Sequence, residues 1–163
     1  MGFASRLDRL LAGRPPDLIA AVAASRLVFR VAHLMEQRID AALVPAELAM
    51  REYLALVLIA DAAVEPLRPS DLSATLGATR TQITRLLDGL ERKGLVRRLP
   101  HDADRRSLQL GLTPAGRDLL KRAAPAVQAA YRASWKGVGT ASTKHAIALL
   151  RTVHDTLAPE EAE

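Results

Sequence analysis

The chain of 163 residues contains no cysteine. A disulfide framework and a switch based on thiol oxidation are therefore both excluded. The four histidines, at positions 33, 101, 145 and 154, show no metal-ligand spacing, and without thiolate partners they are more typical of ordinary surface or satisfied side chains than of a zinc site. We predict no metal site, and any signal that this protein senses must be read by other means.

Long apolar runs and targeting signals are also missing. No uninterrupted apolar stretch approaches the roughly 18 residues typical of a membrane-spanning helix. The N-terminus carries arginines at positions 6, 9 and 14, but it lacks the apolar core of roughly 7 to 15 residues that marks a signal peptide. We therefore expect a cytoplasmic protein without a membrane partner.

Sequence motifs for catalysis are absent as well. There is no G-x-S-x-G, G-x-G-x-x-G, P-loop or H-E-x-x-H pattern, so the sequence indicates no activated nucleophile, no nucleotide site and no metalloprotease helix. Repeats and low-complexity segments are lacking too. We predict that the protein is not an enzyme, has no catalytic residues and needs no cofactor.

What the chain does contain is enough apolar sequence, 49%, for the core of one ordinary domain. The most informative stretch covers residues 69–113. Pro69 opens a short helix that carries the apolar pair Leu72 and Leu76, and Gly77 stands where a C-terminal cap is expected. A second helix follows directly.

The second helix begins at Thr79, whose side chain can cap the free amides, and Gln82 completes a T-x-x-Q capping box. Apolar residues at i, i+3, i+4 and i+7 predict one buried face, formed by Ile83, Leu86, Leu87 and Leu90. Side chains able to hydrogen-bond phosphates or base edges occupy the opposite face, namely Arg80, Thr81, Gln82, Thr84 and Arg85. This arrangement indicates a helix-turn-helix, although the sequence leaves open whether Gln82 caps the helix or reads an adenine.

An alternating pattern predicts an antiparallel hairpin after Gly94. Residues 95–99 form one strand, and Leu108, Leu110 and Leu112 repeat with period two along the other. The tip between the strands is too polar to be buried and carries adjacent arginines. Such a tip suits a wing that follows the DNA backbone into a minor groove.

The positive charge of the chain is concentrated in this region. Residues 78–107 contain eight Lys/Arg and four Asp/Glu, so +4 of the net charge of +5 lies in about a fifth of the sequence. This concentration predicts a local face that binds a polyanion, here double-stranded DNA.

Three short motifs resemble a known family. They are the D-R-R segment at 104–106 followed by alternating leucines, the L-T-P-A-G-R segment at 112–117, and the L-E-x-x-G-L-V segment at 90–96. Together they resemble the MarR family of bacterial winged helix-turn-helix regulators, and the order of elements agrees over residues 18–157. The run from Thr79 to Arg85, with Trp135, looks most like the branch that contains multidrug-efflux repressors.

The resemblance implies roles for the wing. Asp104 would brace the wing and Arg106 would enter the minor groove, although these two residues could instead form a plain surface ion pair. Apart from the resemblance, Arg105 suits a phosphate contact or a solvated side chain. With the helix residues, the predicted DNA-binding set is Thr79, Arg80, Thr81, Gln82, Thr84, Arg85, Asp104, Arg105 and Arg106. Family members that sense peroxide through a reactive cysteine are excluded, because this chain has none.

The rest of the chain predicts long helices around this winged segment. Asp17 is placed as the N-cap of the first and Pro45 ends it, whereas Pro125 either kinks a later helix or starts a new one. We expect these helices over residues 17–43, 46–63, 114–136 and 141–157.

The predicted fold class is mainly α, a winged helix-turn-helix with a small β-hairpin wing, flanked by long N- and C-terminal dimerisation helices. The DNA-binding domain is assigned to residues 46–113 and the dimerisation helices to 17–45 and 114–163. Residues 1–16 form an N-terminal extension, which is either an extra helix on the dimer interface or a frayed end. The outer helices carry more apolar surface than so short a winged module can cover. A two-fold homodimer would bury it and place two recognition helices roughly 34 Å apart on a pseudo-palindrome.

The family resemblance also implies a small lipophilic or phenolic effector, bound between the dimerisation helices and the winged lobe. Candidate lining residues are Arg30, His33, Met35, Tyr53, Asp61 and Trp135, although core or surface packing explains each about equally well. We predict a homodimeric, ligand-responsive DNA-binding regulator, more typical of a repressor than of an activator. The alternatives are a constitutive or architectural DNA-binding protein and a winged-helix protein-interaction module.

Overall fold

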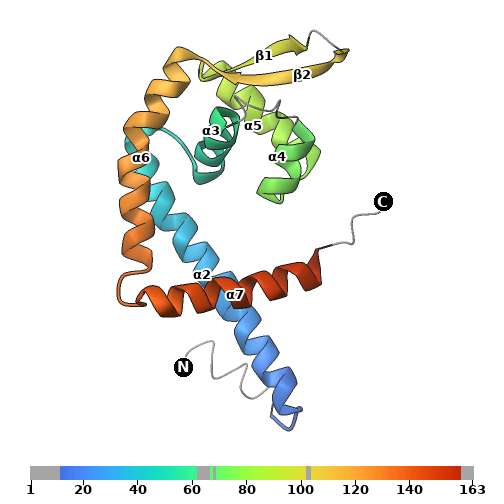
Figure 1. The fold of residues 1–163 in the computed structure, drawn as a ribbon, viewed down its shortest axis with the longest axis vertical. Coiled ribbons are helices and arrows are strands. Elements are labelled where there is room, and N and C mark those ends of the chain that lie inside the picture. The colour runs from blue at the N-terminus through green and yellow to red at the C-terminus, as the bar shows by residue number, and fades with distance from the viewer. Residues whose placement is uncertain (1–11, 62–66, 68, 102–103, 159–163) are drawn as a thin grey trace.

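The long helices Pro16–Leu43 and Pro114–Ser134 run side by side and carry a small lobe at one end (Figure 1). The structure, a computed structural model, describes residues 12–61, 67, 69–101 and 104–158, and the side chains of these except residues 99–108. The elements are α2 (Pro16–Leu43), η1 (Val44–Ala46), α3 (Met50–Asp61), α4 (Pro69–Leu76), α5 (Arg80–Arg92), β1 (Val96–His101), β2 (Asp104–Leu112), α6 (Pro114–Ser134) and α7 (Thr140–Leu157). A mainly helical fold with one antiparallel strand pair confirms the predicted fold class.

The core of the lobe is built from the apolar faces that the sequence predicts. Helix α3 buries Tyr53, Ala55, Leu56 and Ile59, as expected for a helix enclosed on most sides. Helix α5 buries Ile83, Leu87 and Leu90, with Leu86 half-buried. These faces meet Leu72 of α4 and the end of α2 in one cluster.

The hairpin packs on the lobe, with β1 in contact with α5 and β2 in contact with α3. Strand β1 pairs antiparallel with β2 in a register that sets Val96 opposite Leu112 and Arg98 opposite Leu110. Val96, Leu110 and Leu112 are buried, so the period-two pattern turns its apolar side toward the lobe. The predicted hairpin is confirmed.

Two predicted details differ in the structure, and one open alternative is resolved. Helix α2 begins at Pro16, so Asp17 lies in the first turn and makes no N-cap bond; proline is well suited to this first position because its missing N–H would be unsatisfied there. Helix α3 begins at Met50 and not at residue 46, because the chain first makes the 3-10 turn η1 and a left-handed residue at Glu47. The alternative left open at Pro125 is settled, since α6 continues through it as one helix.

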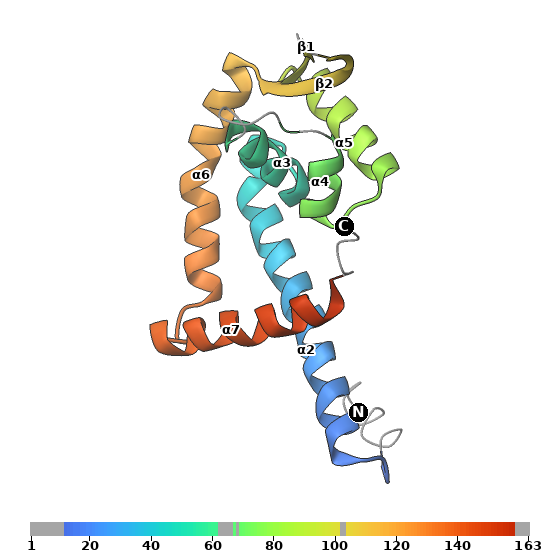
Figure 2. The ribbon, with the colours of Figure 1, turned by 45° about the vertical axis from the view of Figure 1, so that its right-hand side comes forward.

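Helices α2 and α7 bury little of their apolar surface within one chain. In α2 only Ile39 and Leu43 are buried, and in α7 no residue is. In both views α7 runs across the direction of α2 and α6 and does not fold back along them (Figure 1, Figure 2). The segment Pro16–Ala46 is long and apolar enough to cross a membrane by length and composition alone. A dimerisation helix without its partner presents the same kind of exposed apolar surface.

Candidate nucleic-acid interface and effector cavity

Helix α5 starts with the capping box that the sequence predicts. The Thr79 hydroxyl accepts a hydrogen bond from the Gln82 N–H at 3.3 Å, and the Gln82 Oε1 accepts one from the Thr79 N–H at 2.8 Å. The Gln82 oxygen is therefore committed to the cap, a geometry that fixes where the leading turn of α5 begins. The capping box does not use the Gln82 Nε2.

The outer face of α5 is exposed along its leading turns. Thr79 and the predicted contact residues of this helix are all exposed, whereas the inner face is buried in the core. Thr84 donates a hydrogen bond to the Arg80 carbonyl at 3.0 Å, so its hydroxyl proton is already used within the helix. Among the described residues, Arg80 and Arg85 have no ion-pair partner. Two guanidinium groups are thus available to a polyanion on one face.

Two other cations counted in the positive cluster are paired within the chain. Arg98 of β1 makes ion pairs with Asp88 and Glu91 of α5. Lys93, the C-cap of α5, pairs with Glu52 of α3 at 2.9 Å. The sequence-based charge count therefore overstates the number of cations that are free for DNA, because pairs between separate elements cannot be read from composition.

The base of the wing is joined tightly to the start of α6. The Thr113 hydroxyl donates to the Gly94 carbonyl at 2.6 Å and accepts from the Gly116 N–H at 3.0 Å. A Cβ on Gly116 would lie 2.1 Å from the Leu95 carbonyl oxygen. Only glycine allows this approach, which gives a physical reason for the glycine in the L-T-P-A-G-R segment.

The predicted wing contacts are placed by the backbone alone. Asp104, Arg105 and Arg106 lie in the first residues of β2. Their side chains fall outside the described part of the structure, as does the hairpin tip at 102–103. Their roles remain predictions.

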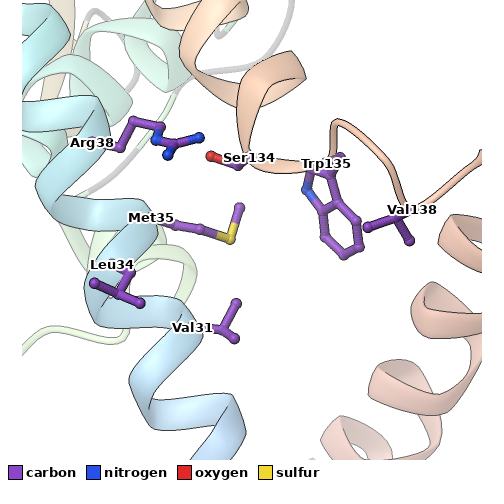
Figure 3. Close-up of a pocket in the computed structure, with 7 residues that line it drawn as sticks. All are labelled: Val31, Leu34, Met35, Arg38, Ser134, Trp135 and Val138. Atoms are coloured by element: carbon purple, nitrogen blue, oxygen red, sulfur yellow. The ribbon is translucent and has the colours of Figure 1, made fainter.

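A cavity of about 500 Å³ lies between α2 and the end of α6. It is lined by Val31, Leu34, Met35, Arg38, Ser134, Trp135 and Val138. Figure 3 shows Met35 and Arg38 extending from α2 toward Ser134 and Trp135 on the other wall. Arg38 is the one charged residue of the lining, and it has no ion-pair partner among the described residues.

The cavity includes two of the predicted effector residues, Met35 and Trp135, and four others lie elsewhere. Arg30 and Asp61 are exposed, and His33 is exposed and within 3.0 Å of Gln37. Tyr53 belongs to the core of the lobe. The predicted effector set did not include Arg38 and Val31, which also line the cavity. Both lie on the same face of α2 as Met35, and their helical spacing from Met35 could have identified them in the sequence.

Tyr53 instead connects the lobe to α6. Its burial raises the pKa of the phenol above the ordinary tyrosine value, and the nearby Tyr131 of α6 raises this pKa further. The folded protein therefore favours the neutral phenol at this junction.

Comparisons with known proteins agree with this geometry. A sequence profile of the MarR family matches residues 48–108. The transcriptional repressor MprA of Escherichia coli is 34% identical over 88 residues, which are 54% of this chain and 50% of that protein. The chain thus spans about half the length of the curated relatives that it matches first.

Solved structures match over more of the chain. CouR from Rhodococcus jostii, solved with p-coumaroyl-CoA, is 31% identical with a TM-score of 0.71, and the match covers 84% of this chain and 93% of CouR. A mutant of MarR from Escherichia coli, solved with operator DNA, is 25% identical with a TM-score of 0.75, covering 82% of this chain and 95% of that one. The family profile over the winged lobe, the repressor relative and the structural matches over most of the chain agree, and on these grounds this chain belongs to the MarR family.

Proposed function

We propose that this chain is a homodimeric transcriptional repressor that binds a pseudo-palindromic DNA operator and is released by a small lipophilic or phenolic ligand. The observation that carries the DNA-binding part is the exposed leading face of α5, where Arg80 and Arg85 have no ion-pair partner within the described part of the chain, opposite an inner face that buries Ile83, Leu87 and Leu90. The structural match to MarR with its operator DNA and the repressor relative MprA support it. A repressor of this kind must reach the chromosomal DNA, which agrees with the predicted cytoplasmic location. The efflux-repressor branch stays a prediction.

The DNA-binding part is tested by salt dependence and by two arginine variants. If a dimer releases about 6 to 10 counterions, its affinity should fall by roughly 10³ to 10⁵ between about 50 and 200 mM salt. Arg85→Ala should relax base preference at one operator position by about 1 to 3 kcal/mol if Arg85 meets a guanine edge. Arg98→Ala is the matched control, because Arg98 is paired with Asp88 and Glu91. Gel retardation and selection from random duplexes measure both, and a flat salt profile would overturn the proposal.

The homodimer is supported by the apolar residues that one chain leaves exposed. Leu27 and Phe29 of α2 are 63% and 73% exposed, and Leu149 and Val153 of α7 are 56% and 54% exposed. An exposed apolar surface of this kind marks an association site on a soluble protein. A two-fold pairing of these helices would bury it and set two copies of α5 on neighbouring half-sites.

The ligand site is supported by the cavity beside Trp135. Its lining is largely apolar, and Arg38 and Ser134 supply the polar groups, the composition of a small-molecule site. A flat apolar ligand with one carboxylate would place its body against Met35 and Trp135 and its charge at Arg38. Ligand binding releases DNA only if the affinities of the two dimer states for it differ.

This site can be tested directly because Trp135 is the single tryptophan of the chain. The probe is cinnamate, and cinnamyl alcohol is the uncharged control with the same ring. Cinnamate should change the fluorescence of Trp135 and bind more tightly than the alcohol. Arg38→Gln should weaken cinnamate binding by about tenfold, as expected for a hydrogen bond to a charged group, and leave the alcohol unaffected. Equal affinities for both probes would overturn the role of Arg38, and retained DNA binding with no ligand response would favour a constitutive regulator.

A further inference from the structure

The start of α3 holds a group of polar contacts that joins three helices. The Asp40 carboxylate of α2 accepts a hydrogen bond from the Met50 N–H at 2.6 Å. Glu52 accepts one from the Ala49 N–H at 2.9 Å and thereby caps the same helix end. The first turn of α3 is therefore fixed from both sides, and one of the two fixing groups belongs to the long helix α2.

Lys93 extends this group to the end of α5. Its Nζ donates to both carboxylate oxygens of Glu52, at 2.9 and 3.0 Å, and to the Glu47 carbonyl at 2.7 Å. Glu47 is the left-handed residue that follows η1, with φ 52°, so the turn itself presents this carbonyl. Three acceptor atoms therefore lie within hydrogen-bond distance of the Lys93 ammonium group.

Because Lys93 lies at the end of α5, its contacts restrain the direction in which that helix points. It is the C-cap of α5, one residue beyond Arg92, and a cation there also interacts favourably with the negative end of the helix dipole. The leading end of α5, which carries Arg80 and Arg85, is held by its own capping box. A restraint at the trailing end therefore determines how the whole helix is aimed relative to α2.

We propose that Asp40, Glu47, Glu52 and Lys93, here called the bracket, set the orientation of α5 relative to α2 and so position the DNA-reading face. In this role Lys93 is a positioning residue and not a phosphate contact, although it belongs to the positively charged stretch. The inference rests on the proposed DNA-binding function.

The two roles of Lys93 predict opposite effects of Glu52→Gln. If the bracket positions α5, removing the Glu52 charge frees Lys93 and weakens operator binding. If Lys93 contacts DNA, the same substitution removes a nearby negative charge, releases Lys93 toward the phosphates and strengthens binding. The sign of the change separates the two roles.

The experiment measures the affinity of the full chain for a labelled duplex carrying the strongest site that the wild type selects from random DNA. A partly exposed ion pair contributes a factor of about 2 to 5 to an equilibrium constant, and a dimer contains two brackets. Lys93→Met and Glu52→Gln should therefore each lower affinity by about 4- to 25-fold. The double variant should be no weaker than the weaker single one, because both changes break the same interaction.

The salt dependence of affinity and a control variant complete the experiment. The dependence of affinity on salt should keep its slope in Lys93→Met, whereas losing a phosphate contact lowers the slope by about 1 per contact. Glu47→Gln is the matched control, since it removes a carboxylate at the same turn and leaves the backbone carbonyl and the Glu52 pair in place. Titration of the active fraction ensures that partial unfolding is not read as weaker binding.

The outcomes are distinct. Weaker binding in both single variants, with an unchanged salt slope and a silent Glu47→Gln, supports the bracket. Tighter binding in Glu52→Gln, or variants indistinguishable from Glu47→Gln, overturns it and leaves the proposed function intact. A wild-type chain that selects no duplex at all overturns the proposed function and this inference together.

Discussion

The winged lobe and the outer helices differ in how far one chain buries their apolar side chains and pairs their charges. In the lobe, apolar faces are buried and cations such as Arg98 and Lys93 have acidic partners from neighbouring elements. Helix α7, by contrast, buries none of its residues within one chain. The lobe therefore buries its apolar faces within one copy of the chain, whereas the outer helices leave theirs exposed, in line with the proposed dimer.

The largest effect is expected from a substitution in the outer helix α7. Leu150 of α7 is 46% exposed in one chain, and Leu150→Asp would place an uncompensated carboxylate in the proposed apolar dimer interface, which costs several kcal/mol. The dimer should dissociate, and operator affinity should fall by about 10² to 10⁴ because the linked second half-site is lost. Analytical ultracentrifugation and gel retardation measure the two consequences.

Thr152→Asp is the control for this variant, because it adds the same charge to another face of α7. It should stay dimeric. A Leu150→Asp protein that is monomeric and still holds the palindrome as tightly as the wild type would show that the second copy is not needed for DNA binding.

An intermediate effect, on the free energy of unfolding, is expected from a substitution where the winged lobe meets α6. Gly116→Ala would put a methyl group 2.1 Å from the Leu95 carbonyl oxygen, and overpacking of this kind costs about 1 to 3 kcal/mol. The neighbouring atom is backbone, so the upper part of that range is expected. Urea unfolding measures the loss as a lower midpoint at an unchanged slope.

Gly89→Ala is a matched control within α5. A Cβ there would meet the Glu52 Oε1 at 3.9 Å, an ordinary van der Waals contact, and alanine favours a helix interior by up to about 1 kcal/mol over glycine. The Gly89 variant should be as stable as the wild type or more so. Equal destabilisation by both substitutions would contradict the close approach at Gly116.

The smallest effect concerns the junction of the two halves and depends on pH. Burial and Tyr131 raise the pKa of Tyr53, so the folded state holds the phenolic proton more tightly than the unfolded state does. The stability that this group contributes is fully present below the ordinary tyrosine pKa of about 10 and is lost as the pH rises through the folded pKa. Tyr53→Phe should flatten the alkaline decline of the unfolding free energy. An identical decline in both proteins would show that Tyr53 does not contribute to it.

Local rules predicted the elements of the lobe well. The capping box of Thr79 and Gln82 and the buried series Ile83, Leu87 and Leu90 depend on spacings of three or four residues, which one helix is sufficient to define. The hairpin follows from a period of two in the same way. The face proposed to read DNA is the opposite side of this same helix α5.

Contacts between distant elements could not be predicted in this way. Lys93 and Glu52 are 41 residues apart, and their pairing depends on the turn at Glu47, which a helix predicted from residue 46 did not include. The effector prediction has the same difficulty at Tyr53, whose residue type suits a crevice but whose helix turns it into the core. Spacing along one helix says which residues share a face, and only the tertiary arrangement says what that face meets.

The close contact at Gly116 has a mechanical consequence. No side chain lies between the Leu95 carbonyl and the backbone of α6 at this point, so the base of the wing moves with α6 as one rigid piece. Helix α6 has 21 residues, a length of about 30 Å at a rise of about 1.5 Å per residue. It is a lever with Trp135 at one end and the wing at the other. A tilt of about 5° pivoting at the Trp135 end would move the wing base by about 2.6 Å over that length, nearly the length of a hydrogen bond.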